Sequence, residues 1–121
     1  MRHCLVVDDS SVIRKVARRI LEDFDFSVSE AEHGSAALEA CRRAMPDMVL
    51  LDWHLPVMDG LEFLESLRKL DNGRHPKVVF CASEADVAQI ARALRAGADE
   101  YILKPFDRAA VEAKLQEVGM L

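Results

Sequence analysis

The sequence has few cysteines, no excess of positive charge and no long hydrophobic run. Its three cysteines, Cys4, Cys41 and Cys81, are widely spaced and never form a C-x-x-C pair. A disulfide framework or a thiolate zinc site is therefore not expected, and a reducing compartment is. Sixteen Lys and Arg residues stand against 21 Asp and Glu residues, which gives a net charge of −5. This balance argues against nucleic acid as a partner, because nucleic-acid binding usually needs a strongly basic surface.

No apolar stretch approaches the roughly 20 residues that are needed to span a bilayer. The opening apolar run, residues 4–7, ends at Asp8 and is too short for the hydrophobic region of a signal peptide. Half of the 121 residues are apolar, which is enough for one compact core. We therefore expect one soluble, cytoplasmic domain over residues 1–121, with no membrane contact and no separate output domain.

Short apolar runs alternate with helical patterns along the whole chain. Uninterrupted runs of this length are typical of strands covered on both faces, as in a parallel sheet, and the weaker run at 26–29 fits a strand nearer an edge. Five βα units in series predict an α/β domain with a doubly wound, five-stranded parallel sheet and five helices, of the flavodoxin-like class. The expected strands are 4–7, 26–29, 48–51, 78–81 and 101–103, and apolar helical stripes lie within 12–21, 37–44, 61–67, 87–94 and 111–118.

In such a sheet the functional side chains stand at the carboxyl ends of the strands. Asp8 and Asp9 follow the first strand, Asp52 the third, residues 82–83 the fourth and Lys104 the fifth. Three converging carboxylates repel one another, and Mg²⁺ would relieve that repulsion. A carboxylate nucleophile, a metal and a lysine together form a phosphoryl-acceptor site. Turn or helix-cap roles explain each residue alone, but they explain the coincidence at the strand ends poorly.

Three motifs resemble the receiver domain of bacterial two-component response regulators. They are VVDDS at residues 6–10, LLDWHLPVMDG at 50–60 and AGADEYILKPF at 96–106. The similarity covers essentially the whole chain, and it implies a stand-alone receiver with a CheY-like fold and the strand order 2-1-3-4-5. It also implies that such a chain is a signalling switch that hydrolyses its own phosphoryl group, and not an enzyme in the usual sense.

The resemblance assigns a role to each residue at the strand ends. Asp52 would accept a phosphoryl group from a histidine kinase or a histidine phosphotransfer protein. Asp8 and Asp9 would bind Mg²⁺, with Asp52 and the backbone carbonyl of His54 as further ligands. Lys104 would contact the phosphoryl group.

The resemblance further implies a switch and a partner surface. The peptide bond between Lys104 and Pro105 is expected to be cis. Tyr101 matches the aromatic residue that moves inward on activation, and Phe106 would help to couple the site to the surface. A downstream protein would bind the face made by helix 87–94, strand 101–103 and helix 111–118, which includes Arg92, Arg95 and Lys114. Chemotaxis or motility adaptor, phosphate sink and phosphorelay intermediate all fit this scheme.

The end of the fourth strand departs from the family pattern. Receivers usually carry Thr or Ser there, whereas this chain has Ala82, followed by Ser83. Either Ser83 supplies the missing hydroxyl, or phosphorylation is coupled weakly to the output surface. A phosphorylation-independent pseudo-receiver is therefore the main alternative. A phosphatase of the haloacid-dehalogenase type would need D-x-D after the first strand, and a flavodoxin-like cofactor binder would need a phosphate-cradling loop there; Asp8-Asp9-Ser10 offers neither.

Two other features have alternative interpretations. His54 lies two residues beyond Asp52 and is expected to tune the lifetime of the acyl phosphate, unless only its carbonyl matters. A basic cluster on helix 12–21 is either a solvated face or a docking site for an acidic or phosphorylated histidine-bearing helix. The cluster consists of Arg14, Lys15, Arg18 and Arg19, and the remaining histidines, His3, His33 and His75, are expected to be ordinary surface residues.

Overall fold

The computed structural model describes residues 1–83 and 87–121, and within them strands and helices alternate as the sequence predicts. No helix in these two stretches is both long enough and apolar enough to cross a membrane. The strands are β1 (Arg2–Val7), β2 (Phe26–Ala31), β3 (Met48–Asp52), β4 (Lys77–Ala82) and β5 (Glu100–Leu103). The helices are α1 (Ser11–Asp23), α2 (Gly34–Arg43), α3 (Gly60–Lys69), α4 (Val87–Ala96) and α5 (Arg108–Glu117).

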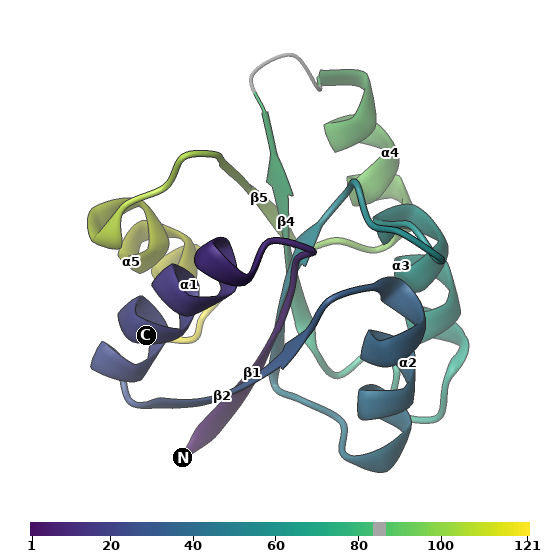
Figure 1. Ribbon diagram of the computed structural model, residues 1–121, viewed down its shortest axis with the longest axis horizontal. Coiled ribbons are helices and arrows are strands. Elements are labelled where there is room, and N and C mark those ends of the chain that lie inside the picture. Colours follow the sequence, from purple (N-terminus) through teal and green to yellow (C-terminus); the bar gives the residue numbers. More distant parts are fainter. Residues whose placement is uncertain (84–86) are drawn as a thin grey trace.

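The strands form one parallel sheet in the order β2-β1-β3-β4-β5, which confirms the predicted topology. Helices α1 and α5 cover one face, and α2, α3 and α4 cover the other (Figure 1). The strand order reverses beside β1, because the chain first adds β2 on one side and then β3 on the other. Ligands of doubly wound sheets bind at the carboxyl ends of the strands at this reversal.

Alternate strand residues supply two separate cores, one on each face of the sheet. On β1, Cys4 and Val6 pack toward α1 and α5, whereas Leu5 and Val7 pack toward α2 and α3. The other central strands, β3 and β4, are divided in the same way, and most of their side chains are fully buried. Burial on both faces explains why these strands read as uninterrupted apolar runs.

The apolar stripes of α1 and α4 are less buried than the sequence analysis expects. On α1, Ala17 and Leu21 are buried, but Val12 and Val16 are 68% and 45% exposed. On α4 the buried residue is Ala93, and Val87 and Leu94 are exposed. A helix buries a stripe only about 100° wide, and each of these helices has more apolar residues than that stripe holds. The surplus forms exposed apolar patches.

Polar side chains cap the helices near the predicted site. The Ser10 hydroxyl accepts a hydrogen bond from the Ile13 N–H at 3.3 Å, so α1 begins immediately after the β1 carboxylates. The Asp59 carboxylate accepts one from the Glu62 N–H at 2.9 Å and caps α3. Both caps follow the carboxyl ends of strands, β1 and β3, so α1 and α3 begin at the carboxyl edge of the sheet.

The three remaining histidines make structural contacts that the sequence analysis did not foresee. His33 caps α2, because its Nδ1 accepts a hydrogen bond from the Ala36 N–H at 3.0 Å. The backbone N–H of His3 and the ring of His75 both contact the Asp47 carboxylate, at 2.8 and 3.0 Å. Together these contacts lower the pKa of Asp47, with the His3 N–H as the larger cause.

Candidate functional site

Three carboxylates meet at the carboxyl edge of the sheet, as predicted from the sequence. Asp8 and Asp9 follow β1, and Asp52 is the last residue of β3, the neighbouring strand. One oxygen from each carboxylate lies within 4.8 Å of the others. Asp8 and Asp52 are buried, at 3% and 8% exposure, whereas Asp9 is exposed. The site therefore has two fixed acids and one that faces solvent.

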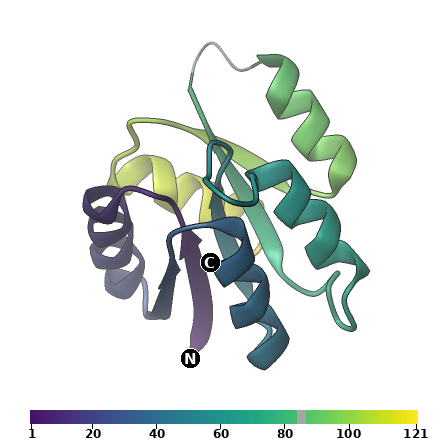
Figure 2. The same ribbon diagram turned by 45° about the vertical axis from the view of Figure 1, so that its right-hand side comes forward.

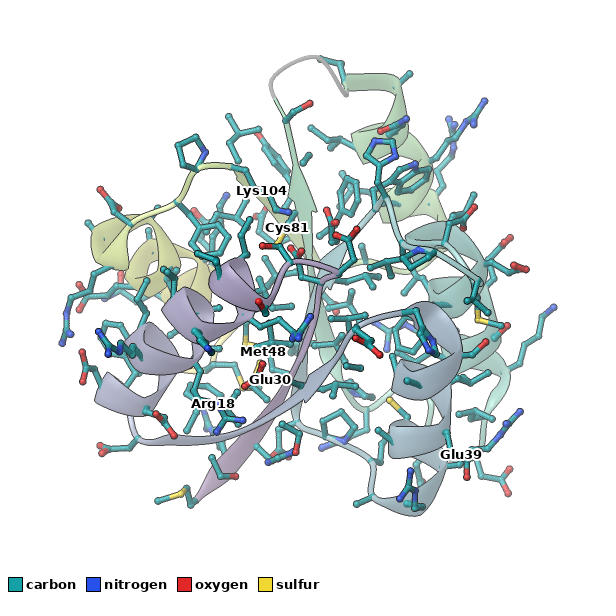
Figure 3. All side chains as sticks on the ribbon, in the orientation of Figure 1. Arg18, Glu30, Glu39, Met48, Cys81 and Lys104 are labelled. Atoms are coloured by element: carbon teal, nitrogen blue, oxygen red, sulfur yellow. The ribbon has the colours of Figure 1, made fainter. Side chains whose placement is uncertain are left out.

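Lys104 follows β5, two strands away from β3, and contacts two of these carboxylates. Its Nζ lies 2.7 Å from Asp8 Oδ2 and 3.1 Å from Asp52 Oδ1. The backbone holds the lysine in place, because its N–H donates to the Ala82 carbonyl at 2.8 Å. The peptide bond between Lys104 and Pro105 is cis, as expected. Figure 3 shows the side chain reaching from the end of β5 over Cys81.

The site carries more negative charge than Lys104 can balance. Burial raises the pKa of Asp52, and the charge of Asp8 raises it further, although Lys104 opposes both. Burial alone would lower the pKa of Lys104, but its hydrogen bond to Asp8 and the charge of Asp52 raise it overall. Lys104 therefore keeps its charge between two buried carboxylates, while burial makes the charged form of Asp52 less favourable. The oxygen donors of Asp8, Asp9 and Asp52 fit Mg²⁺, a hard cation that prefers a few carboxylates.

Several local hydrogen bonds fix the Asp8 backbone and side chain. Asp8 Oδ1 accepts from the Ser10 N–H at 2.9 Å, and the Asp8 N–H donates to the Ala31 carbonyl at 3.1 Å. Arg14 donates to the Asp8 carbonyl at 2.7 Å. The contact from Arg14 was missed in the sequence analysis, where this residue appears only as part of a basic cluster. Arg14 therefore supports a site residue directly.

The basic cluster on α1 divides into two pairs. Arg14 and Arg18 bind the Glu30 carboxylate of β2 at 3.0 and 2.8 Å, and Figure 3 shows Arg18 and Glu30 directed toward one another. Lys15 and Arg19 are exposed and make no ion pair with any residue in the described stretches. Only Lys15 and Arg19 remain available to a partner.

The loop after β3 is held against the sheet. Trp53 is buried and packs edge-to-face on Phe80, with ring centroids 5.1 Å apart. The Gly60 N–H donates to the Trp53 carbonyl at 3.0 Å, and a Cβ on Gly60 would lie 2.5 Å from the Asp52 carbonyl oxygen. Only glycine fits this approach. The His54 side chain, two residues beyond Asp52, is exposed.

The predicted switch residues lie on β4, β5 and the loop that follows β5. Ala82 is buried at the end of β4, opposite Leu103, and the neighbouring Ser83 is exposed. The last position of β4 therefore has no side-chain hydroxyl. Tyr101 is half-buried, and the Lys114 Nζ lies 4.7 Å from the centroid of its ring. Phe106 packs against the core under α1 and α5, while Pro105 is exposed.

Known proteins share this sequence pattern and fold. The model of the response regulator receiver domain matches residues 4–116. A chemotaxis protein CheY of Halobacterium salinarum is 35% identical over 117 residues, which are 97% of this chain and 96% of that protein. The structure of Vibrio cholerae chemotaxis protein CheY4 superposes with a TM-score of 0.91 at 29% identity and covers 98% of both chains.

A second solved structure resembles this chain and holds a metal. It is the receiver domain of a sensor histidine kinase of Pseudomonas aeruginosa, with a magnesium ion coordinated in its active-site cleft. Its TM-score is 0.86 at 30% identity, and the match covers 95% of this chain and 94% of that one. Sequence, fold and the acidic cluster at the carboxyl edge of the sheet all agree, and the chain belongs to the response regulator receiver domain family.

Proposed function

We propose that this chain is a phosphorylation-controlled signalling switch, not an enzyme for a small-molecule substrate, and that Asp52 is its phosphoacceptor. The observation that carries the proposal is the position of the Lys104 Nζ, which lies 3.1 Å from Asp52 and 2.7 Å from Asp8 beside a third carboxylate. A nucleophilic carboxylate next to a fixed cation and an acidic metal-binding cluster is the arrangement that phosphoryl transfer requires.

In this proposal a histidine kinase or a histidine phosphotransfer protein supplies the phosphoryl group. A carboxylate oxygen of Asp52 attacks the phosphorus of the phosphohistidine, and the phosphorus–nitrogen bond breaks with its electron pair left on the imidazole. An acyl phosphate forms, which water later hydrolyses. Lys104 would exchange its contact with Asp52 for one with a phosphoryl oxygen. Mg²⁺, held by Asp8, Asp9, Asp52 and the His54 carbonyl, would supply further neutralising charge to the transferred group.

The phosphodonor would dock between α1 and the loop after β5. An apolar cleft of about 330 Å³ lies there, lined by Ile13, Val16, Lys104, Pro105 and Phe106. The exposed Val12 extends the apolar surface along α1. Lys15, which makes no ion pair with the residues that the structure describes, adds a positive charge. Apolar surface next to the acceptor suits a helix that carries the donor histidine.

The downstream protein would bind the face formed by α4, β5 and α5. Val87, Ala91 and Leu94 are exposed at helical spacing on α4, and Leu103 is 40% exposed at the end of β5. Such a stripe fits the apolar side of a partner helix. The similarity to CheY proteins favours a chemotaxis or motility adaptor over a phosphate sink or a phosphorelay intermediate, and a cytoplasmic location follows from the kinase partner.

Incubation with acetyl phosphate and Mg²⁺ tests the proposal directly. The wild-type chain is expected to gain the mass of one phosphoryl group, and Asp52→Asn is expected to gain none, because an amide is not a nucleophile of this kind. Asp59→Asn is a matched control, since this exposed cap residue of α3 lies outside the acidic cluster. A wild-type chain that stays unmodified with donor in excess and hydrolysis slowed would overturn the proposal.

Beryllofluoride, a mimic of the phosphoryl group, tests whether Ser83 supplies the hydroxyl that Ala82 lacks. If Ser83 supplies the hydroxyl, Ser83→Ala should lose most of the shift of the Tyr101 resonances that beryllofluoride causes, and Ala82→Thr should restore it in the Ser83→Ala background. An unchanged response of Ser83→Ala would exclude the substitution by Ser83. A wild-type chain whose Tyr101 signals do not respond at all would favour the pseudo-receiver, the alternative that Ala82 supports.

His54 is expected to set the lifetime of the acyl phosphate. Its side chain is exposed two residues beyond Asp52, and the proposal places it along the path of the attacking water. His54→Ala should change the rate of phosphate release severalfold without preventing phosphorylation, because only the His54 carbonyl is assigned to the metal. The time course of phosphate release measures this, and a course that matches the wild type would limit the role of His54 to its backbone.

A further inference from the structure

A cleft rich in arginine lies at the edge of the sheet opposite the acidic site. Six residues line it, and we call it the arginine cleft: Arg68, Arg74, Arg95, Ala96, Gly97 and Asp99. It lies where the chain enters β4 and β5, whereas Asp52 and Lys104 stand at the carboxyl ends of strands. Figure 2 shows α3 and α4, which supply two of the arginines, side by side on one face of the sheet. Its volume is about 370 Å³.

The floor of the cleft is built around Arg68. All five N–H groups of its guanidinium are used, for Gly97 O at 3.1 and 2.7 Å, Gly73 O at 2.9 Å, Pro76 O at 2.8 Å and Asp99 Oδ2 at 3.1 Å. Gly97 has φ of 117°, and a Cβ there would lie 3.1 Å from the Arg68 side chain. Arg68 is therefore a fixed positive charge with no donor left for a ligand.

The other two arginines have donors to offer. Arg74 and Arg95 are exposed and make no hydrogen bond or ion pair with residues 1–83 or 87–121. Asp99 supplies the one carboxylate among the six lining residues, and its Oδ2 already accepts from Arg68 and from the Val78 N–H at 2.8 Å. Three guanidiniums and one carboxylate leave the lining with an excess of two positive charges.

We propose that the arginine cleft binds a small molecule that carries a diphosphate group. Two guanidiniums on separate elements, one in the loop before β4 and one in the last turn of α4, can each grip one phosphate in the bidentate manner that arginine favours. The cleft volume falls within the roughly 300–1,000 Å³ typical of small-molecule sites. Among the described residues, no aromatic or large apolar side chain lines it, so recognition rests on the anionic part of the ligand. The proposal does not require phosphorylation at Asp52.

Pyrophosphate, the anionic part alone, is the probe that tests the proposal. Titration into metal-free, isotope-labelled protein should shift the amide signals of Gly97 and Asp99 in a saturable manner. The double variant Arg74→Ala/Arg95→Ala should weaken binding at least tenfold. Both side chains are exposed and make no bonds in the described stretches, so this variant should keep the melting temperature of the wild type.

Two controls separate this site from other sources of anion binding. Arg92→Ala removes an exposed arginine of α4 that does not line the cleft, and it should bind pyrophosphate as the wild type does. Asp52→Asn should also bind unchanged, which excludes the acidic site. The proposal is overturned if binding does not saturate, if the double variant binds equally well, if Arg92→Ala weakens binding as much, or if sulfate binds as tightly as pyrophosphate.

Discussion

Replacing Lys104 with Met is expected to destabilise the metal-free protein by about 3 kcal/mol at pH 7, the loss typical of removing one partner from a buried ion pair. Among the residues of the two described stretches, Lys104 alone forms ion pairs with Asp8 and Asp52. Methionine replaces most of the apolar part of the side chain but removes the ammonium group, which leaves both buried carboxylates unpaired next to Asp9. Urea denaturation of the two proteins measures the difference.

Three further measurements separate charge balance from packing. Excess Mg²⁺ should reduce the difference in stability between Lys104→Met and the wild type. Adding Asp52→Asn to Lys104→Met should recover much of the lost stability. The gap should also shrink as the pH falls toward about 4, because protonation of one carboxylate removes the repulsion. Lys15→Met, at an exposed lysine of α1, is the control. Lys104 does not balance these acids if Lys104→Met is as stable as the control Lys15→Met. The same conclusion follows if neither Mg²⁺ nor Asp52→Asn reduces the stability loss of Lys104→Met.

The features that the sequence predicted well are those that depend on local pattern and on a general rule of topology. Strands buried on both faces must be apolar throughout, so the runs at 4–7, 48–51 and 78–81 could be located directly. The carboxyl ends of parallel strands share one edge of the sheet, so the sequence alone predicts that Asp8, Asp52 and Lys104 lie close together. The structure places all three within hydrogen-bond reach.

Features that depend on long-range partners could not be predicted in this way. The charge of Arg14 does not reveal that it holds the Asp8 carbonyl and Glu30, because a long side chain can reach several surfaces. The rotation of α4 about its axis was also undetermined. Its apolar stripe would suit the core equally well, yet the small Ala93 is the buried residue of α4 and Val87 is exposed.

Arg68 is the clearest case of a residue whose role appears only in the structure. It belongs to α3, but its hydrogen bonds end on the loop before β4 and on the turn between α4 and β5. That turn leads into β5, which pairs with β4 from Glu100 to Leu103 and ends at Lys104. The guanidinium thus helps to fix the strand that carries the lysine of the acidic site.

Arg68→Ala is expected to cost at least about 3 kcal/mol of stability, because several half-buried carbonyl oxygens lose their donor together. The Arg68 side chain is only 14% exposed, so water cannot replace all of these bonds. Arg68→Lys should recover less than half of the loss, since an ammonium can reach Asp99 but cannot span the three carbonyls that the planar fork joins. Urea denaturation at pH 7 measures both variants, and hydrogen exchange at the Gly97 and Asp99 amides should show the local loosening.

Arg74→Ala serves as the matched control for this prediction, because Arg74 lines the same cleft and is exposed. Its stability should stay within about 0.5 kcal/mol of the wild type, as for most surface substitutions. Full stability in Arg68→Lys would mean that the ion pair with Asp99 matters and the carbonyl bonds do not. Full stability in Arg68→Ala would mean that the turn before β5 is held by its backbone alone, through the Asp99 N–H, which donates to the Val78 carbonyl at 2.8 Å. If Arg68→Ala loses stability while Lys104 stays paired with Asp8 and Asp52, the turn before β5 and the acidic site after β5 are stabilised independently of one another.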